Sequence, residues 1–431
     1  MKEFFKHYRQ TIILLLSIII GAIIGLIWKE GATVLSPFGD IFLNLMFVII
    51  VPLIFLTITT SISRITQPKR LSKIMGSIAL VIVITSIIAA LIGILSTVFI
   101  KLVDVNDGNQ ILSSLETETE EVEETEDLNI LERTVSAITV SDFTGLLSKN
   151  NIIAIVVFSC LFGCAMRLSG EKAEHVKRFL ESATDVIMNL LKIIMYYAPI
   201  GLGCYFAALV GSFGATIAIG YAKTFVVYTL VSIVYYFVIY TLYAFIAGGK
   251  NGIKAFWKNI IPPTLTSLAT CSSAASIPVN MTAAEKIGVS DDIAETAIPL
   301  GMSFHKDGSI IGSVFKIMFL VCLFGTSVAT FGEVSKVLLV SLVATLLVTA
   351  VPIGGGTISE MMILTMMGYP INALPILTIV ATVIDAPATM LNVVGDTTVS
   401  MLVSRIVDGK DWMKKSESKK TNTDDKKTVG V

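Results

Sequence analysis

The chain has 431 residues, of which 54% are hydrophobic and only 15% are charged, and its mean hydropathy is +0.81. Soluble domains carry roughly 45–50% apolar and about 25% charged residues. This composition excludes a soluble enzyme, a disordered chain and a protein with a basic face for nucleic acid, so no nucleic-acid partner is expected.

Several apolar stretches are long enough to cross a bilayer, whose hydrocarbon core of ~30 Å needs about 20 helical residues. The clearest are Ile12–Trp28, Ile41–Ile62, Ile78–Ile100, Ile152–Met166 and Thr224–Ala247. Backbone polar groups in lipid must be bonded internally, so these stretches are predicted to be helices. The first is too long for a signal-peptide core and lacks a small-residue cleavage site. The sequence therefore predicts an all-α polytopic membrane protein embedded in a lipid bilayer.

Charges between these stretches predict the orientation. Basic residues precede the first helix, separate the second from the third, follow the fourth and sixth, and fill the C-terminal tail: Lys2, Lys6, Arg9, Arg64, Lys69, Arg70, Lys73, Lys172, Lys177, Arg178, Lys250, Lys254, Lys258 and the lysines of 410–427. By the positive-inside rule these positions and both termini are cytoplasmic. The acidic segment Glu116–Asp127 is then external, either as a solvated loop or as a region that concentrates cations.

From about residue 252 the apolar runs become short and are interrupted by Pro, Gly, Ser and Thr, around 262–278 and again around 351–359. Apolar arms too short to span, joined by a polar tip, predict re-entrant hairpins. Each hairpin precedes a helix with a predicted mid-membrane polar break, at Met302–Ser309 and at Asp385–Asp396. A hairpin followed by a broken helix, repeated twice, is typical of inverted-repeat transporters.

Ionisable residues fall inside these predicted breaks. A charge at mid-bilayer costs from ~2.5 to above 10 kcal/mol, so such residues are functional candidates. Asp385, Asn392 and Asp396 are spaced 7 and 4 apart and share one helical face. Asp307, Asp385 and Asp396 are three carboxylates, and Lys306 is the one lysine within the breaks. Because the negative charge exceeds the positive charge, a cation is expected to bind in this region. An all-oxygen site suits a hard monovalent cation better than zinc.

Four motifs carry a family resemblance: CSSAASIPVNM (271–281), PLGMSFHKDGS (299–309), VPIGGG (351–356) and DAPATMLNVVGD (385–396). From about residue 10 to 408 the chain resembles the dicarboxylate/amino acid:cation symporter family, which has the glutamate-transporter fold. The resemblance implies eight transmembrane helices plus two re-entrant helical hairpins, inverted repeats, a homotrimer and an elevator-type transport cycle in the cell membrane. The Lys-rich tail and a compact chain without long inserts indicate a bacterial inner membrane.

The resemblance also implies a division of the chain. The expected parts are scaffold helices 1–2 in residues 1–75, transport-domain helix 3 in 76–103, an acidic extracellular loop in 104–140, scaffold helices 4–5 in 141–213, the rest of the transport domain (helix 6, hairpin 1, helix 7, hairpin 2 and helix 8) in 214–408, and a cytoplasmic Lys-rich tail in 409–431.

Three sodium sites follow from the same resemblance. The first comprises Asp396 with the carbonyls of Gly301, His305 and Asn392, the second Ser303 with the carbonyls of Thr345, Leu346 and Val348, and the third Thr85, Ser86 and Asp307.

The implied substrate pocket places Asp385 against the substrate amino group. The other expected pocket residues are Ser273, Thr389 and Asn392 for the carboxylate and amine, Val351 and Gly355 at the extracellular gate, and Cys271, Ser309 and Ala388 in the lining.

The largest departure from the family is a missing arginine. The residue that grips an acidic side chain in the family is replaced by Ala388, and no arginine occurs between Arg178 and Arg405. Without that bidentate clamp, we expect symport of a small neutral amino acid such as serine, threonine, alanine or cysteine. The alternative is a dicarboxylate or acidic amino acid symporter in which Lys306 or Lys316 replaces the arginine.

Two alternative functions, from classes other than transporters, are a channel and a substrate sensor. An enzyme is not expected, because the chain lacks HExxH and GxSxG motifs.

Two further departures concern ion coupling. Lys306 replaces a methionine, and acts either as a tethered cation that lowers the sodium count or introduces proton coupling, or as a side chain without effect on coupling. His305 replaces an asparagine and is either a proton carrier or a satisfied core histidine. Ile82 stands where the family has a tyrosine near the third site. Glu360 is a third coupling candidate; the sequence leaves open whether Glu360 and Lys316 face water or the scaffold.

Overall fold

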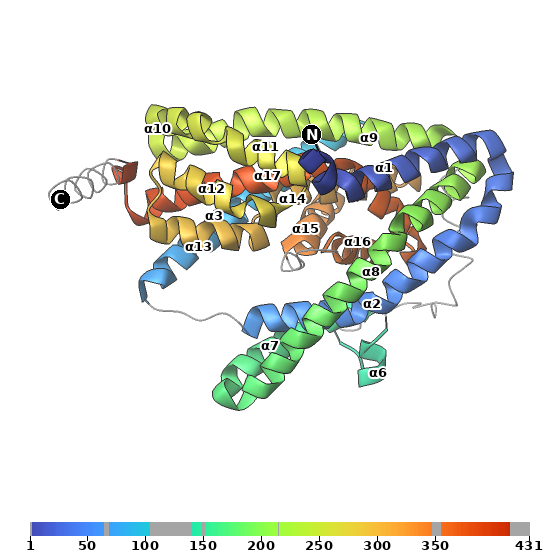
Figure 1. Ribbon diagram of the computed structural model, residues 1–431, viewed down its shortest axis with the longest axis horizontal. Helices are drawn as coiled ribbons and strands as arrows, with labels where there is room; N and C mark the ends of the chain where they lie inside the picture. Colours follow the sequence, from blue (N-terminus) through green and yellow to red (C-terminus); the bar gives the residue numbers. More distant parts are fainter. Residues whose placement is uncertain are drawn as a thin grey trace.

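The computed structural model describes residues 2–63, 69–103, 139–148, 151–213, 215–346 and 355–413, and every regular element in these ranges is helical (Figure 1). The acidic segment Glu116–Asp127, most of the Lys-rich tail and the tip of the second predicted hairpin lie outside them. Four helical stretches of the described chain are long and apolar enough to cross a bilayer: Leu16–Phe42, Lys73–Thr97, Ala215–Asn259 and Ile371–Val407.

One group of helices packs around the longest helix. It consists of α1 (Lys2–Trp28), α2 (Ser36–Ser63), α7 (Ile152–Ser169) and α8 (Glu174–Phe213), with the 3₁₀ turn Lys29–Leu35 joining α1 to α2. The 40 residues of α8 extend about 60 Å, and α8 crosses both α1 and α2 (Figure 1). Glycine permits the close crossing, since a Cβ on Gly21 of α1 would lie 2.3 Å from the carbonyl oxygen of Gly203 in α8.

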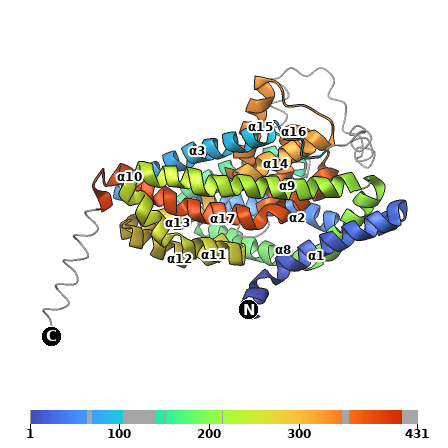
Figure 2. The same cartoon turned by 90° about the horizontal axis from the view of Figure 1, so that it is seen from above.

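A second group surrounds α17 (Leu374–Val407), which runs through its centre (Figure 2). Its other members pack on α17 directly or through one another: α3 (Lys69–Thr97), α9 (Ala215–Val234), the π-helical turn Tyr235–Ile239, α10 (Tyr240–Asn259), α11 (Ile261–Thr270), α12 (Ser273–Ile287), α13 (Asp291–Phe304), α14 (Asp307–Leu323), α15 (Phe331–Leu346) and α16 (Gly355–Met367). Short elements complete the described chain: α6 (Phe143–Leu146) and the 3₁₀ turns Gly170–Ala173 and Ile371–Ala373.

The first predicted hairpin is formed by α11 and α12, which pack against each other. The chain reverses at Cys271, whose φ of 46° is left-handed, and the Ser272 hydroxyl caps α12 by accepting from the Ala275 N–H at 3.3 Å. At 1.5 Å per residue the arms measure only about 15 and 22 Å, shorter than a ~30 Å hydrocarbon core. Helices α15 and α16 pack together in the same way.

The two predicted polar breaks have different outcomes. The first is confirmed, because α13 ends at Phe304, α14 begins at Asp307, and the two residues between them are non-helical. The second is wrong, because α17 continues through Asp385–Asp396 despite Pro387. A proline removes one N–H donor, and tight packing of α17 on its neighbours holds the remaining helix together. The polar groups that α17 offers for binding are therefore side chains and not backbone groups freed by a helix break.

The crossing of α14 and α17 gives a first prediction. A Cβ on Gly308 would lie 2.2 Å from the carbonyl oxygen of Ala388, and backbone cannot move aside as a side chain can. We expect Gly308→Ala to lower the free energy of unfolding by about 1–3 kcal/mol, measured by thermal unfolding in detergent. The control Gly332→Ala meets only Thr330 Oγ1 at 3.9 Å and is expected to unfold like the parent; equal melting of both variants would contradict the crossing.

Candidate transport site

The break between α13 and α14 directs two side chains into the interior. His305 is extended, with φ −98° and ψ 110°, and Lys306 follows with φ −143° and ψ 61°. His305 and Asp307 are both fully buried. The sequence SFHKDG thus ends one helix, starts the next and places an imidazole and a carboxylate side by side in the core.

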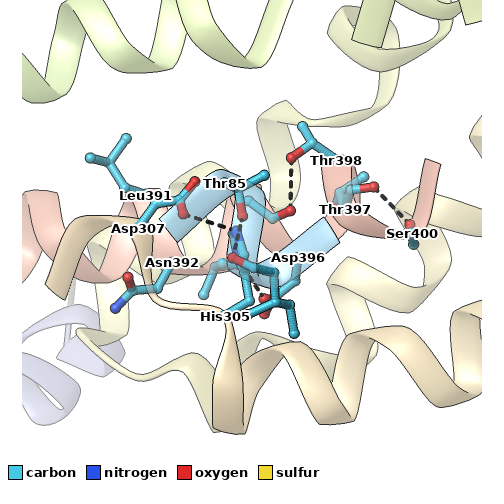
Figure 3. Close-up of polar contacts among 12 residues, drawn as sticks. Thr85, His305, Asp307, Leu391, Asn392, Asp396, Thr397, Thr398 and Ser400 are labelled. Carbon is cyan, nitrogen blue, oxygen red and sulfur yellow. Dashed lines mark hydrogen bonds and ion pairs between the residues drawn. The ribbon is translucent and has the colours of Figure 1, made fainter. Parts of the chain in front are cut away.

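The imidazole of His305 lies between two carboxylates (Figure 3). Its Nε2 is 3.1 Å from Asp307 Oδ1, and its Nδ1 is 3.3 Å from Asp396 Oδ1. Asp396 comes from α17, so the ring joins the start of α14 to the central helix. Sequence reasoning assigned only the carbonyl of His305 to a cation site; the structure places the ring itself between the carboxylates.

Glycines make room for this cluster. A Cβ on Gly301 would lie 2.4 Å from Asp396 Oδ1, and a Cβ on Gly395 would lie 2.3 Å from Cε1 of the His305 ring. The end of α13 therefore lies against the Asp396 carboxylate, while α17 has a recess that the imidazole fills.

A ladder of tyrosines holds the same region from the α9–α10 side. Tyr235, in the π-helical turn, donates to Asp307 Oδ2 at 2.9 Å. Tyr228 donates to the Gly308 carbonyl at 2.7 Å, Tyr240 to the Leu391 carbonyl at 2.6 Å, and Tyr221 to the Ile376 carbonyl at 3.2 Å. Sequence reasoning missed these residues. The seven-residue spacing of Tyr221, Tyr228 and Tyr235 was the available signal, because it places them on one helical face.

The third predicted cation site is assembled only in part. Thr85 and Ser86 of α3 are buried, and Thr85 lies beside the His305–Asp307 pair in Figure 3. The Thr85 hydroxyl, however, donates to the Ile82 carbonyl at 3.1 Å, and Tyr235 supplies the hydroxyl to Asp307. A tyrosine is therefore present at this carboxylate although Ile82 occupies the family's tyrosine position; it comes from a different helix.

The second predicted cation site lies largely beyond the described chain. Ser303 is half-buried in α13 and the Thr345 hydroxyl is 2.9 Å from that of Ser313. Leu346 ends α15, and Val348 lies outside the described residues, as does the gate residue Val351. Gly355 begins α16.

Predicted substrate residues gather around Asp385 on α17. Thr389 Oγ1 lies 3.5 Å from Asp385 Oδ1, and the Cys271 thiol, at the tip of the first hairpin, lies near the same carboxylate. Ser273 starts α12 beside that turn, and Ala388 is buried one turn along α17 from Asp385. The hairpin tip and the central helix thus share one acidic group.

Asn392 and Ser309 form two reciprocal hydrogen bonds. The Ser309 N–H donates to Asn392 Oδ1 at 3.2 Å, and Asn392 Nδ2 donates to Ser309 Oγ at 3.0 Å. One turn further along α17, Asn280 of α12 donates to the Val393 carbonyl at 2.8 Å and accepts from Thr397. These amides tie α12 and α14 to α17 on either side of the cluster.

A buried ion pair joins α14 to α16. Lys316 Nζ is 3.1 Å from Glu360 Oε1, and Thr378 of α17 donates to Glu360 Oε2 at 2.7 Å. Both charged side chains are less than 10% exposed. Of the alternatives that the sequence left open, exposure to water is excluded, since both side chains are buried and each charge compensates the other.

Lys306 has a different environment. It is half-buried at the start of α14, and Asp396 is the acidic group whose charge acts on it. No described residue forms an ion pair with it. The side chain that does bridge the two carboxylates is its neighbour, His305.

The sodium:dicarboxylate symporter family model matches residues 11–406. This chain belongs to that family. The "Proton/sodium-glutamate symport protein" of Bacillus caldotenax is 26% identical over 398 residues, covering 90% of this chain and 92% of that protein. The protein of the same description from Bacillus subtilis is 25% identical over 394 residues, covering 90% of each chain. The "C4-dicarboxylate transport protein" of Rhizobium leguminosarum is 28% identical over 323 residues, covering 74% and 71%. The chain is thus a multi-pass, cation-coupled membrane symporter and not an enzyme.

The tyrosine ladder gives a second prediction. Tyr235→Phe removes the hydroxyl that donates to Asp307, at a cost of about 1–3 kcal/mol for the buried acceptor left unsatisfied. We expect a lower melting temperature and slower uptake. Tyr196→Phe alters a side chain that is 79% exposed and is expected to change neither; a Tyr235→Phe variant with unchanged melting and uptake would contradict the role of the ladder.

The buried ion pair Lys316–Glu360 gives a third prediction. Removing one partner leaves an uncompensated charge, so Lys316→Met or Glu360→Gln alone is expected to cost about 3–5 kcal/mol, and the double variant less than either. Thermal unfolding of the three variants measures the coupling. The exposed pair Glu174–Arg178 is the control, and its neutralisation is expected to have no measurable effect. Additive losses in the Lys316–Glu360 cycle would contradict the pairing.

Proposed function

We propose that this chain carries out secondary active, cation-coupled symport of a small neutral amino acid such as serine, threonine, alanine or cysteine. The observation that carries the proposal is the Asp385 carboxylate, set between Thr389 and the Cys271 thiol, with no arginine between residues 178 and 405. A buried carboxylate is a partner for a substrate ammonium group, and without a guanidinium fork the pocket has no bidentate partner for a side-chain carboxylate.

The second candidate is an acidic amino acid or C4-dicarboxylate, which the printed names of the relatives favour. It requires a lysine in place of the arginine. Lys316 is engaged by Glu360 at 3.1 Å, so its charge is already compensated. Lys306 is half-buried in the break between α13 and α14, and the charge of Asp396 acts on it. Among the described residues, neither lysine forms a hydrogen bond or ion pair with a predicted pocket residue, and the neutral substrate is the better fit.

The proposed mechanism is an elevator cycle in a homotrimer. Helices α1, α2, α7 and α8 would form the static scaffold, and the group around α17 would move with substrate and cations. The separate packing of these two groups supports this division. In this proposal the chain has eight transmembrane helices and two re-entrant hairpins, with both termini cytoplasmic and the hairpin–helix repeat (α11–α14, then α15–α17) in inverted topology.

The coupling ion in this proposal is sodium, with a proton as the alternative. The tethered-cation role of Lys306 is tested with Lys306→Met, for which a higher sodium Hill coefficient or a changed pH dependence of uptake is expected. If both stay as in the parent, Lys306 has no part in coupling.

Substrate choice is tested by counterflow in proteoliposomes. Liposomes loaded with unlabelled serine, threonine, alanine, cysteine, aspartate, glutamate or succinate are offered the same labelled compound, with sodium and pH varied. Exchange of neutral amino acids, with little inhibition of serine uptake by aspartate, is expected. Strong aspartate inhibition and aspartate exchange would establish the acidic alternative, and exchange without accumulation under an ion gradient would indicate a channel or a sensor.

The amine contact is tested with Asp385→Asn. Loss of the only carboxylate described among the predicted pocket residues is expected to reduce amino acid exchange at least ~10-fold, corresponding to one lost charged hydrogen bond of about 1.5–3 kcal/mol. Asp291→Asn, at the exposed start of α13, is the matched control. Exchange that survives in Asp385→Asn at the parental rate would exclude Asp385 as the acceptor.

A further inference from the structure

The buried ion pair Lys316–Glu360 lies where α14, α16 and α17 meet. Lys316 is the only charged residue of α14 after Asp307, and Glu360 is the only charged residue of α16. The Glu360 carboxylate has a partner at each oxygen, since Oε1 is 3.1 Å from Lys316 Nζ and Oε2 accepts from Thr378 of α17 at 2.7 Å. These two contacts fix the orientation of the carboxylate.

Stability alone does not account for a charged pair in this position. Taking two charges out of water costs several kcal/mol for each ion, and well-packed apolar side chains of similar volume are often as stable as the pair. The chain neighbours of both residues are apolar and buried, namely Phe315, Ile317 and Met361. An apolar contact between α14 and α16 would therefore suffice to hold these helices together, and the charges indicate a further role.

The register of α14 against α17 shows which residues lie near Lys316. A Cβ on Gly308 would lie 2.2 Å from the carbonyl oxygen of Ala388, and a Cβ on Gly312 would lie 2.9 Å from Cδ1 of Ile384. The two helices are thus antiparallel, and four residues in α14 correspond to four residues in α17. Lys316, four residues beyond Gly312, therefore lies about one turn before Ile384.

Asp385 is the carboxylate of these two helices that is nearest to Lys316 along the helix axis. At 1.5 Å per residue it is about 8 Å from the level of Lys316, whereas Asp307 is about 14 Å away. The charge of Lys316 acts on the Asp385 carboxylate. Because lysine has a flexible four-carbon side chain, an ammonium group released from Glu360 would turn toward Asp385.

We propose that Glu360 is a positioning residue of the substrate site. Its carboxylate holds the Lys316 ammonium away from Asp385 and so leaves Asp385 open to the ammonium group of the substrate. This inference rests on the proposed function, in which Asp385 binds the substrate amine. Without the charge of Glu360, an internal ammonium and the substrate ammonium compete for one carboxylate.

Equilibrium binding to the full chain in lipid nanodiscs tests the inference. The probe is the labelled amino acid, among serine, threonine, alanine and cysteine, that the parent exchanges fastest in counterflow. Glu360→Gln keeps the size of the side chain and removes its charge. We expect Kd to rise at least ~10-fold, because the substrate has to displace the Lys316 ammonium from Asp385. An unchanged Kd would overturn the inference.

Lys316→Met separates this role from a structural one. Loss of either partner leaves an uncompensated buried charge, so a pair that only holds the fold predicts weaker binding in both single variants. The inference predicts no increase of Kd in Lys316→Met, because no competing ammonium remains, and a Kd within about 2-fold of the parent in the double variant. Equal weakening in both single variants, or weak binding in the double variant, would contradict it.

Equilibrium binding also handles loss of folded protein, since Kd is measured separately from the number of binding sites. If Glu360→Gln does not fold, Glu360→Asp takes its place, because it retains the charge and shortens the side chain by one methylene. The longer, weaker ion pair is then expected to raise Kd about 3-fold, and a parental Kd would overturn the inference. Glu295→Gln, at an exposed position of α13, is the matched control and should bind as the parent does.

Asp385→Asn distinguishes failure of this inference from failure of the proposed function. Loss of binding in Asp385→Asn together with parental binding in Glu360→Gln would overturn the inference alone. Parental binding in both variants, or a parent that exchanges none of the four amino acids, would contradict the proposed function and with it the inference.

Discussion

Charge inside a membrane-spanning core has to be compensated within that core, and this constraint organises the centre of the symporter. A charge at mid-bilayer costs several kcal/mol unless it is paired. His305 lies between Asp307 and Asp396, and Lys316 pairs with Glu360. Each pairing joins separate helices: the first connects the start of α14 to α17, and the second connects α14 to α16. These contacts therefore also hold the helices of the transport site in register.

The hydroxyl and amide groups around the charges complete this framework. Tyr228, Tyr235 and Tyr240 reach from α9, the π-helical turn and α10 to α14 and α17. A π-turn in the middle of a long helix is frequently found at functional sites, and here it carries the tyrosine that donates to Asp307. Asp385 differs from the other acids, because no described basic side chain forms an ion pair with it, although the charge of Lys316 acts on it. In our proposal, this difference separates the substrate site from the charges that maintain the fold.

Much of the fold was predictable from the sequence because membrane helices follow from hydropathy alone. The apolar runs, the first hairpin turning at Cys271 and the helix break at 305–306 were all expected, since Pro, Gly and Ser interruptions carry a local signal. The predicted break in α17 was wrong because polar side chains do not interrupt a helix whose backbone remains hydrogen-bonded. The family motifs found Asp396, Asp307 and Asp385. They missed the tyrosines and the Lys316–Glu360 pair, whose partners are separated by 44 residues or more in sequence.

The sequence by itself determined that this is a helical membrane protein, that its second half is built from interrupted apolar segments, and that no arginine lies between Arg178 and Arg405. These properties depend on composition and local pattern. Only the tertiary structure decided which basic group meets which acid. Sequence reasoning offered Lys306 as one possible internal cation, yet it is the ring of its neighbour His305 that lies between the carboxylates. Adjacent residues in an extended segment point in different directions, so the packing of α13, α14 and α17 selects one of them for the core.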